Sequence, residues 1–532
     1  MVLPLTPVRF KRHAAQIYGR KIGVVCGEQR FTYAQFNDRA DRLSNALLGL
    51  GLQAGDRVAF LSFNCHRLLE AYYGVPQIGA ILLPLNIRLS PEELAFILND
   101  AAPRLLFFDA EFTPLVEALR TKVQAVEQYI LLSGQPPSGA HPETYDDLID
   151  AAEPREIDFL AIDENSTAEL FYTSGTTAHP KGVMLTHRNL YLHALYCMAS
   201  NAIQPLETDV VLYTVPLFHV NAWGTPHYLT LTGGRHVMLK KFDPAAVLEL
   251  TARERVTSFG LVPTMAIALL NHPALHLHDL SSLRKVNLGG APANVALVRE
   301  LERKIPGCHF YGGYGLTETS PVITIAAPKS YLTDEPENVH YRRKSSAGME
   351  LPGSEIRVVD PDGSEVASDG REVGEVIVRG DVVMAGYWKQ PEETARVMRD
   401  GWFHTGDLAT VDDEGYILIV DRSKDMILSG GENIGSAEVE RVIYGHPAVL
   451  ECAVIAVPDD KWGEVPKAIV TLRPGAAATD DEILAHCCQH LAGFKVPKSV
   501  EFRESLPKGG TGKILKRTLR EPYWAGHERK VH

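Results

Sequence analysis

Cysteine is scarce and scattered in this sequence. Only seven of the 532 residues are cysteines, at positions 26, 65, 197, 308, 452, 487 and 488. Their number is odd and no two of them form a C-x-x-C pair, so the sequence indicates neither a disulfide framework nor a zinc site. The twenty histidines likewise lack a spacing that is typical of metal ligands. We expect reduced thiols in a cytosolic protein.

Long apolar runs and an excess of positive charge are also missing. No run approaches the ~20 apolar residues that a transmembrane helix needs. The start of the chain, MVLPLTPVRFKRHAAQ, has no apolar core of the signal-peptide type. The net charge is −13, which is unfavourable for a general nucleic-acid binder. We therefore expect a cytoplasmic protein without a transmembrane segment and without a nucleic-acid partner.

The order of apolar segments predicts an α/β fold. The runs "RVAFLS" (57–62), "AILLPL" (80–85) and "RLLFFD" (104–109) are typical of buried strands, and segments with helical periodicity separate them. Thr32 and Ser90 stand where helix caps are expected. The alternation returns after residue 165, with expected strands at 210–218, 236–241, 258–263 and 285–290. This pattern favours doubly wound parallel sheets with helices on both faces.

The chain is too long for one simple core, and its pattern changes twice. Segments rich in strands and turns begin near residue 341 and indicate a β-rich subdomain. A further change near residue 422 leads into alternating helices and strands of small-domain size. We predict a large N-terminal domain at 1–421 and a small, mobile α+β C-terminal domain at 422–532.

One loop is unusually rich in hydroxyls and glycine. It lies within "ELFYTSGTTAHPKG" (169–182), after an expected buried strand and before an expected helix capped by Thr186. Its hydroxyl groups, its glycines and Lys181 could surround phosphate oxygens. The sequence does not match G-x-x-x-x-G-K-[ST], so the loop is not a Walker A motif. Composition alone also permits a flexible linker.

Three later stretches share this character: "YGGYGLTETSP" (311–321), "GWFHTGDLATVDDEGY" (401–416) and "PKGGTGKILKR" (507–517). Singly each is typical of a turn. Together with "TSGTT..PKG" and "DRSKDMI.SGGENI", in this order, they resemble the adenylate-forming superfamily of acyl-CoA synthetases, peptide-synthetase adenylation domains and beetle luciferases. The resemblance covers essentially the whole chain.

The resemblance implies an ATP-dependent acid–thiol ligase. A carboxylate would attack the α-phosphorus of ATP and form an acyl-adenylate, and the thiol of CoA would then displace AMP. Both reactants of the first step are anions, so cations and hydrogen-bond donors must neutralise the developing charge. Mg²⁺ is the expected metal. A nucleotide-binding module without activity is the alternative from another class.

The resemblance also implies a set of site residues. Those expected to bind ATP or AMP are Thr173, Ser174, Gly175, Thr176, Thr177, Lys181, Gly289, Gly290, Ala291, Tyr314, Gly315, Thr317, Asp407, Arg422 and Lys513. Those expected to take part in catalysis are Lys513, Thr317, Glu318 and His219, and those expected to hold Mg²⁺ are Glu318 and Thr177. Tyr314 would stack on adenine, Asp407 would accept the ribose hydroxyls, and Lys513 would bridge the carboxylate and the α-phosphate.

Relatives carry out the second step after a rotation of the C-terminal domain. The hinge would fall on Lys424. The thiol would approach along a face formed by Ser429, Gly430, Gly431 and Glu432. The sequence leaves open whether the chain forms a homodimer.

The acid is expected to bind beside "PLFHVNAWG" (216–224). His219 follows Phe218 where amino-acid-activating relatives have an aspartate, so a counter-charge for a substrate ammonium is missing. The expected acyl pocket consists of His219, Val220, Trp223, Gly224, Leu261, Val262 and Met265. The segment is most similar to fatty-acyl-CoA ligases of medium to long chain. A short thioether acid, an aromatic acid and a carrier protein as acceptor remain alternatives.

Overall fold

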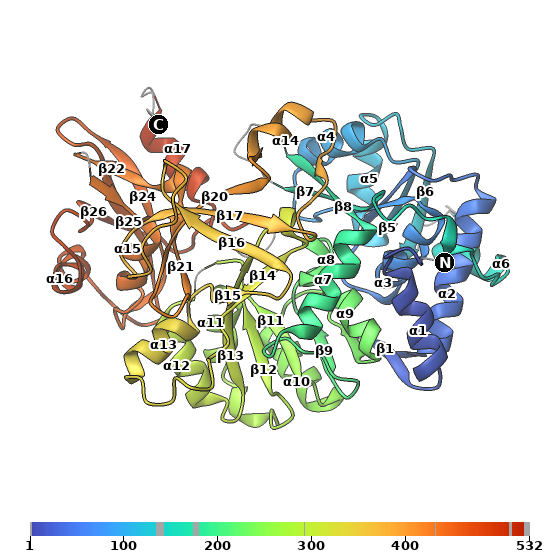
Figure 1. The fold of residues 1–532 in the computed structure, drawn as a ribbon, viewed down its shortest axis with the longest axis horizontal. Coiled ribbons are helices and arrows are strands. Elements are labelled where there is room, and N and C mark those ends of the chain that lie inside the picture. Colours follow the sequence, from blue (N-terminus) through green and yellow to red (C-terminus); the bar gives the residue numbers. More distant parts are fainter. Residues whose placement is uncertain are drawn as a thin grey trace.

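The computed structural model describes residues 3–134, 143–173, 180–291, 293–430, 432–509 and 513–525. This part of the chain forms two large sheets with helices packed against them, a smaller antiparallel sheet and a C-terminal sheet (Figure 1). The predicted α/β class is confirmed. Among the helices described, none combines the length and the apolar character that a bilayer crossing requires.

The first large sheet has seven strands in the order β18-β8-β7-β4-β3-β5-β6. They are β3 (Arg57–Leu61), β4 (Ile81–Pro84), β5 (Leu105–Asp109), β6 (Gln128–Ser133), β7 (Thr167–Thr173), β8 (Lys181–Thr186) and β18 (Gly386–Tyr387). The five strands from β7 to β6 run parallel. The apolar runs at 57–62, 80–85 and 104–109 form β3, β4 and β5 respectively, as predicted.

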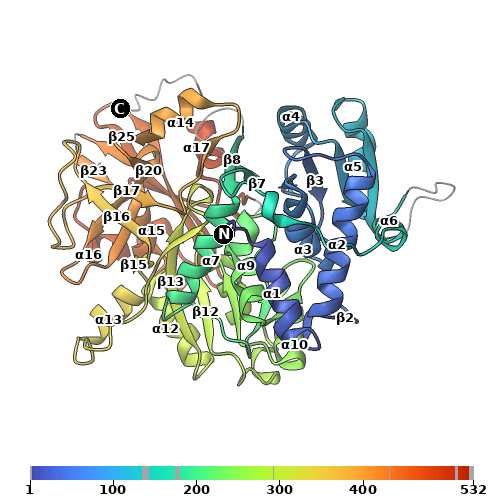
Figure 2. The ribbon, with the colours of Figure 1, turned by 45° about the vertical axis from the view of Figure 1, so that its right-hand side comes forward.

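The second large sheet has nine strands in the order β15-β14-β13-β12-β11-β9-β10-β1-β2. They are β1 (Ile22–Cys26), β2 (Gln29–Thr32), β9 (Val210–Tyr213), β10 (Arg235–Met238), β11 (Ser258–Leu261), β12 (Lys285–Leu288), β13 (His309–Gly315), β14 (Val322–Ile325) and β15 (Met349–Glu350). The six from β13 to β1 are parallel. Helices α7 (His187–Ala199) and α9 (Thr225–Thr232) lie between the two large sheets (Figures 1 and 2).

The predicted helix caps are present. The Thr32 hydroxyl accepts the backbone N–H of Gln35 at the start of α2 (Tyr33–Gly49), and the Gln35 side chain accepts the Thr32 N–H in return. Ser90 and Glu93 form the same reciprocal pair at α4 (Pro91–Ala101). Such caps are local in sequence, which is why the sequence predicts them well.

Apart from β18, the strands after residue 350 form two smaller sheets. The antiparallel one consists of β16 (Ser354–Val359), β17 (Gly374–Gly380), β19 (Met398–Arg399), β20 (Trp402–Val411) and β21 (Ile417–Arg422). The C-terminal one consists of β22 (Ile427–Ser429), β23 (Glu432–Ile434), β24 (Val449–Asp459), β25 (Gly463–Leu472) and β26 (Ser499–Phe502). Sheet membership changes between β21 and β22. The boundary predicted at residue 421 stays a prediction, because a change of sheet does not define a domain.

Two local predictions differ from the structure. The hydroxyl-rich loop does not lead directly into a helix: β8 follows it and pairs antiparallel with β7, so the loop connects a β-hairpin. Thr186 does cap α7, which begins only after β8. The strand expected at 210–218 ends at Tyr213. The Asn64 amide donates to the carbonyl oxygens of Tyr213 and Val215 at 2.9 and 3.2 Å, and these side-chain bonds replace the strand ladder beyond that point.

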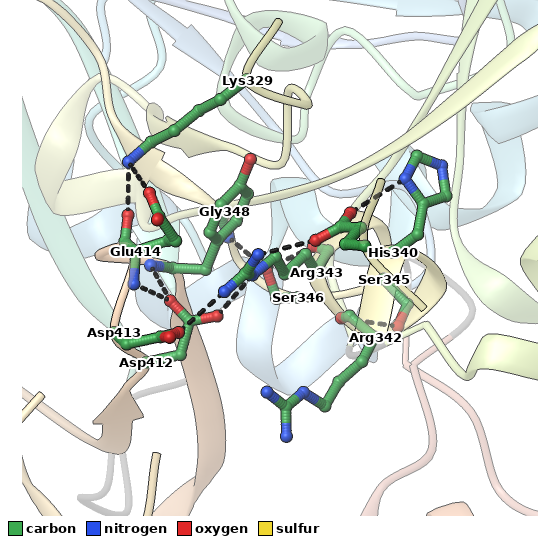
Figure 3. A network of polar contacts seen from close by, with 12 residues as sticks. Lys329, His340, Arg342, Arg343, Ser345, Ser346, Gly348, Asp412, Asp413 and Glu414 are labelled. Atoms are coloured by element: carbon green, nitrogen blue, oxygen red, sulfur yellow. Dashed lines mark hydrogen bonds and ion pairs between the residues drawn. The ribbon is translucent and has the colours of Figure 1, made fainter. Parts of the chain in front are cut away.

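A buried arginine connects the helix α13 (Glu337–Lys344) to the turn between β20 and β21 of the smaller antiparallel sheet (Figure 3). Arg343 lies in α13 and donates to Glu335 at 2.6 Å, to Asp412 at 2.7 Å and to Asp413 at 2.7 Å. The two aspartates lie in the turn between β20 and β21. The carboxylates hold the pKa of the Arg343 guanidinium above its usual value, against the effect of burial.

Replacing Arg343 by alanine is expected to lower the free energy of unfolding by about 3 kcal/mol, because Asp412 would stay buried without its cation. The urea midpoint of the full chain measures this change. Arg357→Ala is the matched control. It removes an exposed partner of Glu365 and should change stability by less than about 1 kcal/mol. Equal losses in the two variants would contradict a special contribution of the buried network.

Candidate active site

The predicted nucleotide residues gather around one cavity of about 2930 Å³. It opens at the carboxyl ends of β7, β9, β11, β12 and β13, which is where ligands bind in sheets of this type. The described candidates that line it are Thr173, Lys181, Gly289, Gly290, Ala291, Tyr314, Gly315, Thr317, Glu318, Asp407, Arg422 and Lys513. The predictions for Ser174, Gly175, Thr176 and Thr177 fall outside the described residues.

Two glycines after β12 keep one wall of the cavity flat. The Gly289 N–H donates to the Leu261 carbonyl oxygen at 3.1 Å, and this bond extends the sheet by one residue. A Cβ atom on Gly289 would stand 3.0 Å from the Trp223 ring, and Gly290 has a φ of +74° that favours glycine. Tyr314 lines the same cavity from the neighbouring strand β13. The arrangement suits a planar ring held between a tyrosine and backbone.

A buried carboxylate joins three parts of the site. Asp407 lies in β20, directly opposite Arg422 of β21. Its Oδ1 is 3.1 Å from the Arg422 Nε, and its Oδ2 accepts the Tyr314 hydroxyl at 2.8 Å. A carboxylate has about four lone-pair directions, so Asp407 can still accept two vicinal hydroxyls.

Glu318 and Lys181 meet at the ring of Tyr387. The Tyr387 hydroxyl donates to Glu318 Oε1 at 2.9 Å, and the Lys181 ammonium lies 5.2 Å from the centre of the same ring. Lys181 is itself buried in an ion pair with Glu393. Its charge at the base of the hairpin loop is therefore anchored and does not swing freely.

The surroundings of Glu318 fit a magnesium ion. Burial raises the pKa of Glu318, and a nearby divalent cation would favour its ionised form. Mg²⁺ usually takes one or two protein carboxylates and completes its shell with phosphate oxygens and water. In the described part of the chain no group of three or more His, Cys, Asp or Glu side chains is placed to hold a metal without such help.

Sequence reasoning missed Tyr387 and Glu393. Both line the cavity, and they lie more than 200 positions after Lys181 in the chain. Burial raises the pKa of Tyr387, whereas Arg396 and Lys181 hold the pKa of Glu393 at about 2. Neither residue belongs to a glycine-rich or hydroxyl-rich stretch, so the sequence carries no local signal for them.

Lys513 reaches the cavity from the C-terminal part of the chain. Its side chain is exposed to the cavity, yet the surrounding protein and the nearby Arg422 charge lower its pKa to about 8. The charge of Lys513 also acts on His219. Burial, followed by Lys513, lowers the pKa of His219 to about 4, so the imidazole is neutral at pH 7. The Lys513 charge therefore acts on His219, and Arg422 acts on Lys513, although nearly 300 residues separate His219 from Lys513 in sequence.

Not all residues of the predicted acyl pocket line the cavity. His219, Val220, Trp223 and Val262 line the cavity. Leu261 and Met265 do not: they face the core between the nine-stranded sheet and its helices. Gly224 is also absent from the lining, because it packs against His193, whose ring would stand 2.5 Å from an added Cβ.

The residues predicted to face CoA lie apart from the cavity. Ser429 is buried at the end of β22, Gly430 packs against Trp462, and Glu432 is exposed. None of these three lines the cavity. The side chain of Lys424 and the whole of Gly431 fall outside the described residues. The hinge and the thiol face therefore stay predictions.

Comparisons with known proteins agree with this geometry. The family model "AMP-binding enzyme" matches residues 10–388, and "AMP-binding enzyme C-terminal domain" matches residues 438–513. A long-chain-fatty-acid–CoA ligase of Thermus thermophilus is 41% identical over 97% of this chain and 95% of its own length. A feruloyl-CoA synthase of Amycolatopsis sp is 42% identical over 93% of this chain and 95% of its own length.

Solved structures agree as well. The crystal structure of the anthranilate CoA ligase AuaEII in complex with anthranoyl-AMP superposes with a TM-score of 0.89 and is 28% identical, covering 98% of each chain. The likeness therefore extends through both parts of the chain and not only through the large sheets.

The lowered pKa of Lys513 predicts an alkaline limb in carboxylate-dependent ATP–pyrophosphate exchange. The ammonium is charged below about pH 8 and loses its charge as the pH rises through that value. We expect kcat/KM for ATP to fall above about pH 8, because kcat/KM reports the free enzyme. Lys513→Arg should remove the limb, since a guanidinium stays charged. An unchanged midpoint in the arginine variant would assign the limb to another group.

Proposed function

The chain belongs to the AMP-binding enzyme family and is an AMP-forming acyl-CoA ligase that uses ATP and CoA, and on this premise we propose that its acid is a medium- to long-chain fatty acid. The observation that supports the chain length most directly is the depth of the cavity along β9 and β11.

That depth follows from which strand residues line the cavity. Ser258 and Gly260 of β11 and Val211 of β9 line it as well as the residues at the strand ends. From Ser258 to Leu261 a strand extends ~10 Å. Phe218, Ile267 and Ile325 add apolar lining. An acid with an apolar chain would gain about 25 cal/mol for each Å² of surface that it buries there.

The first half-reaction forms a bond between a carboxylate oxygen and the α-phosphorus and breaks the bond to the β-phosphate, so pyrophosphate leaves. We propose that Lys513 binds both the substrate carboxylate and the α-phosphate, and that Thr317 binds the α-phosphate. Lys181, fixed by Glu393, would face the leaving phosphates at the base of the hairpin loop. A magnesium ion on Glu318 would supply further neutralisation of the phosphate charge.

The adenosine part would be held by Tyr314 and Asp407. Tyr314 and the glycines after β12 offer the flat space for adenine, and Asp407 the acceptor for the ribose hydroxyls. Arg422 keeps the carboxylate oriented through its contact with Oδ1. Neutral His219 stands beside Lys513 without competing for the anions, which agrees with its lowered pKa.

The second half-reaction needs a different arrangement. The CoA sulfur would attack the acyl carbon, the thiol proton would leave with solvent, and the bond from that carbon to the AMP oxygen would break. Lys513 occupies the cavity in this structure, so we propose that the C-terminal part at 422–532 rotates about Lys424 before the thiol enters. The β22–β23 hairpin with Gly430 would then supply the thiol face.

Lys513→Ala is expected to separate the two half-reactions. Adenylate formation, measured by pyrophosphate exchange, should fall by about a hundredfold or more, because a charge stabilising the transition state is lost. Conversion of supplied acyl-AMP and CoA to the thioester should keep most of its rate. Lys498→Ala removes an exposed lysine of the same part of the chain and is the control. An equal loss in both half-reactions would contradict the assigned role.

Acids of graded chain length test the proposed substrate in a coupled AMP-release assay. We expect kcat/KM to be highest for medium- to long-chain acids and lower for ferulate and 3-(methylthio)propanoate. Val211→Phe fills the deep end of the cavity and should reduce kcat/KM for the longest acids by about tenfold, while short acids stay unaffected.

Two results would overturn this proposal. A higher kcat/KM for ferulate or for the thioether acid would show that the substrate is a compact acid and not a fatty acid. Pyrophosphate exchange without CoA-dependent AMP release would instead indicate a carrier protein as acceptor.

A further inference from the structure

The side of the cavity formed by Val220 and Trp223, called the acyl wall here, contains a left-handed turn. Five consecutive residues have positive φ angles: Val220 (36°), Asn221 (45°), Ala222 (46°), Trp223 (63°) and Gly224 (83°). Only glycine, and to a lesser degree asparagine, adopts this region readily, and a β-branched valine there is a clear outlier. Strain of this kind persists only where neighbouring groups hold it in place.

The side chain of Asn221 supplies one such restraint from inside the turn. It is fully buried, and its Oδ1 accepts the backbone N–H of Gly224 at 2.6 Å. Its Nδ2 points the other way and donates to Glu169 Oε2 at 2.8 Å. The same amide therefore closes the turn and ties it to another element.

Glu169 belongs to the seven-stranded sheet, whereas the turn follows β9 of the nine-stranded one. It is completely buried on β7, and its second oxygen accepts the His227 Nε2–H at 2.8 Å. The rings of Tyr72 and Tyr73 lie edge-on against His227, with ring centres 6.0 and 5.9 Å away. A carboxylate enclosed in this way cannot move without breaking buried hydrogen bonds.

The turn determines where the Trp223 ring lies. A Cβ atom on Gly260 would stand 2.7 Å from that ring, and one on Gly289 would stand 3.0 Å from it. The indole thus covers the ends of β11 and β12, between the adenine wall and the deep part of the cavity. A turn with negative φ angles would have the opposite hand, and its side chains would project in different directions from the turn.

We propose that Glu169 and Asn221 are positioning residues that fix the acyl wall, and so determine how the acid binds and which acids are accepted. His227 completes the pair by holding the carboxylate of Glu169. The inference rests on the proposed function in one respect, the location of the acid beside Trp223. None of the three residues is given a part in the chemistry itself.

The experiment compares Asn221→Gly, Asn221→Ala and Glu169→Gln with Thr230→Val. Glycine removes the tether but tolerates the left-handed backbone, whereas alanine removes the tether and opposes the backbone conformation. Glutamine keeps an acceptor for Asn221 and is the conservative variant. Thr230 is a fully buried residue of α9 that bonds to His236, so Thr230→Val removes a buried hydrogen bond outside the turn.

We expect KM for the acid to rise by about tenfold in Asn221→Gly and more in Asn221→Ala, because small displacements of a positioning element have effects of this size. KM for ATP should stay within about twofold in both. The ratio of kcat/KM for long acids to kcat/KM for short acids should become smaller. Glu169→Gln should show a smaller rise, and Thr230→Val should leave KM for the acid unchanged while lowering the melting temperature.

Two outcomes would overturn the proposal. One is a loss of stability in the Asn221 variants with KM for the acid unchanged, which would indicate a purely structural network. The other is a parallel rise of both KM values, which would indicate general damage to the site. If the proposed substrate is wrong, the wild-type enzyme itself will not accept fatty acids, so this result is distinguishable from a failure of the positioning proposal. The Asn221 variants would then be compared with the acid that the wild-type enzyme accepts.

Discussion

The Asp407 carboxylate joins three of the structural units that meet at the active site. One oxygen bonds to Tyr314, which comes from the nine-stranded sheet, and the other faces Arg422, the last residue of the smaller antiparallel sheet. Asp407 also acts electrostatically on Lys513, which belongs to the C-terminal part. The net effect on Lys513 is a lowered pKa, because desolvation by the surrounding protein and the Arg422 charge outweigh the attraction of Asp407. A ligand bound to Asp407 is therefore placed against all three structural units at once.

Much of the fold follows from local patterns. The reciprocal pair of Ser90 and Glu93 needs only four consecutive residues, and the short apolar runs of the parallel strands are recognisable because both faces are buried. The stretches around Tyr314 and Asp407 are recognisable as candidates because glycine-rich turns after apolar runs are rare in this combination. In these cases the information lies within a few positions of the residue concerned.

The remaining features depend on partners that are remote in sequence. Glu393 and Tyr387 reach Lys181 only because β18 pairs with β8, and no local pattern encodes that pairing. The sequence predicts loop and not strand up to the Thr186 cap, because the strand character of Lys181–Thr186 depends on β7 beside it. Leu261 does not line the cavity for a simpler reason: side chains alternate along a strand, so a residue between Gly260 and Val262 faces the opposite side.

The strand β7 relates the two binding regions to each other. Glu169 and Thr173 lie four residues apart, on the same face of the strand by its two-residue period, and ~13 Å apart along it. Glu169 holds the turn that forms the acyl wall, whereas Thr173 begins the hairpin connection expected to enclose the phosphates. The acid and the phosphates would therefore be positioned by one buried strand, which leaves little freedom in the distance between the reacting oxygen and phosphorus. Lys513 comes from the smaller C-terminal part, so under the proposed rotation the cation is the component that moves while the reactants keep their relative placement.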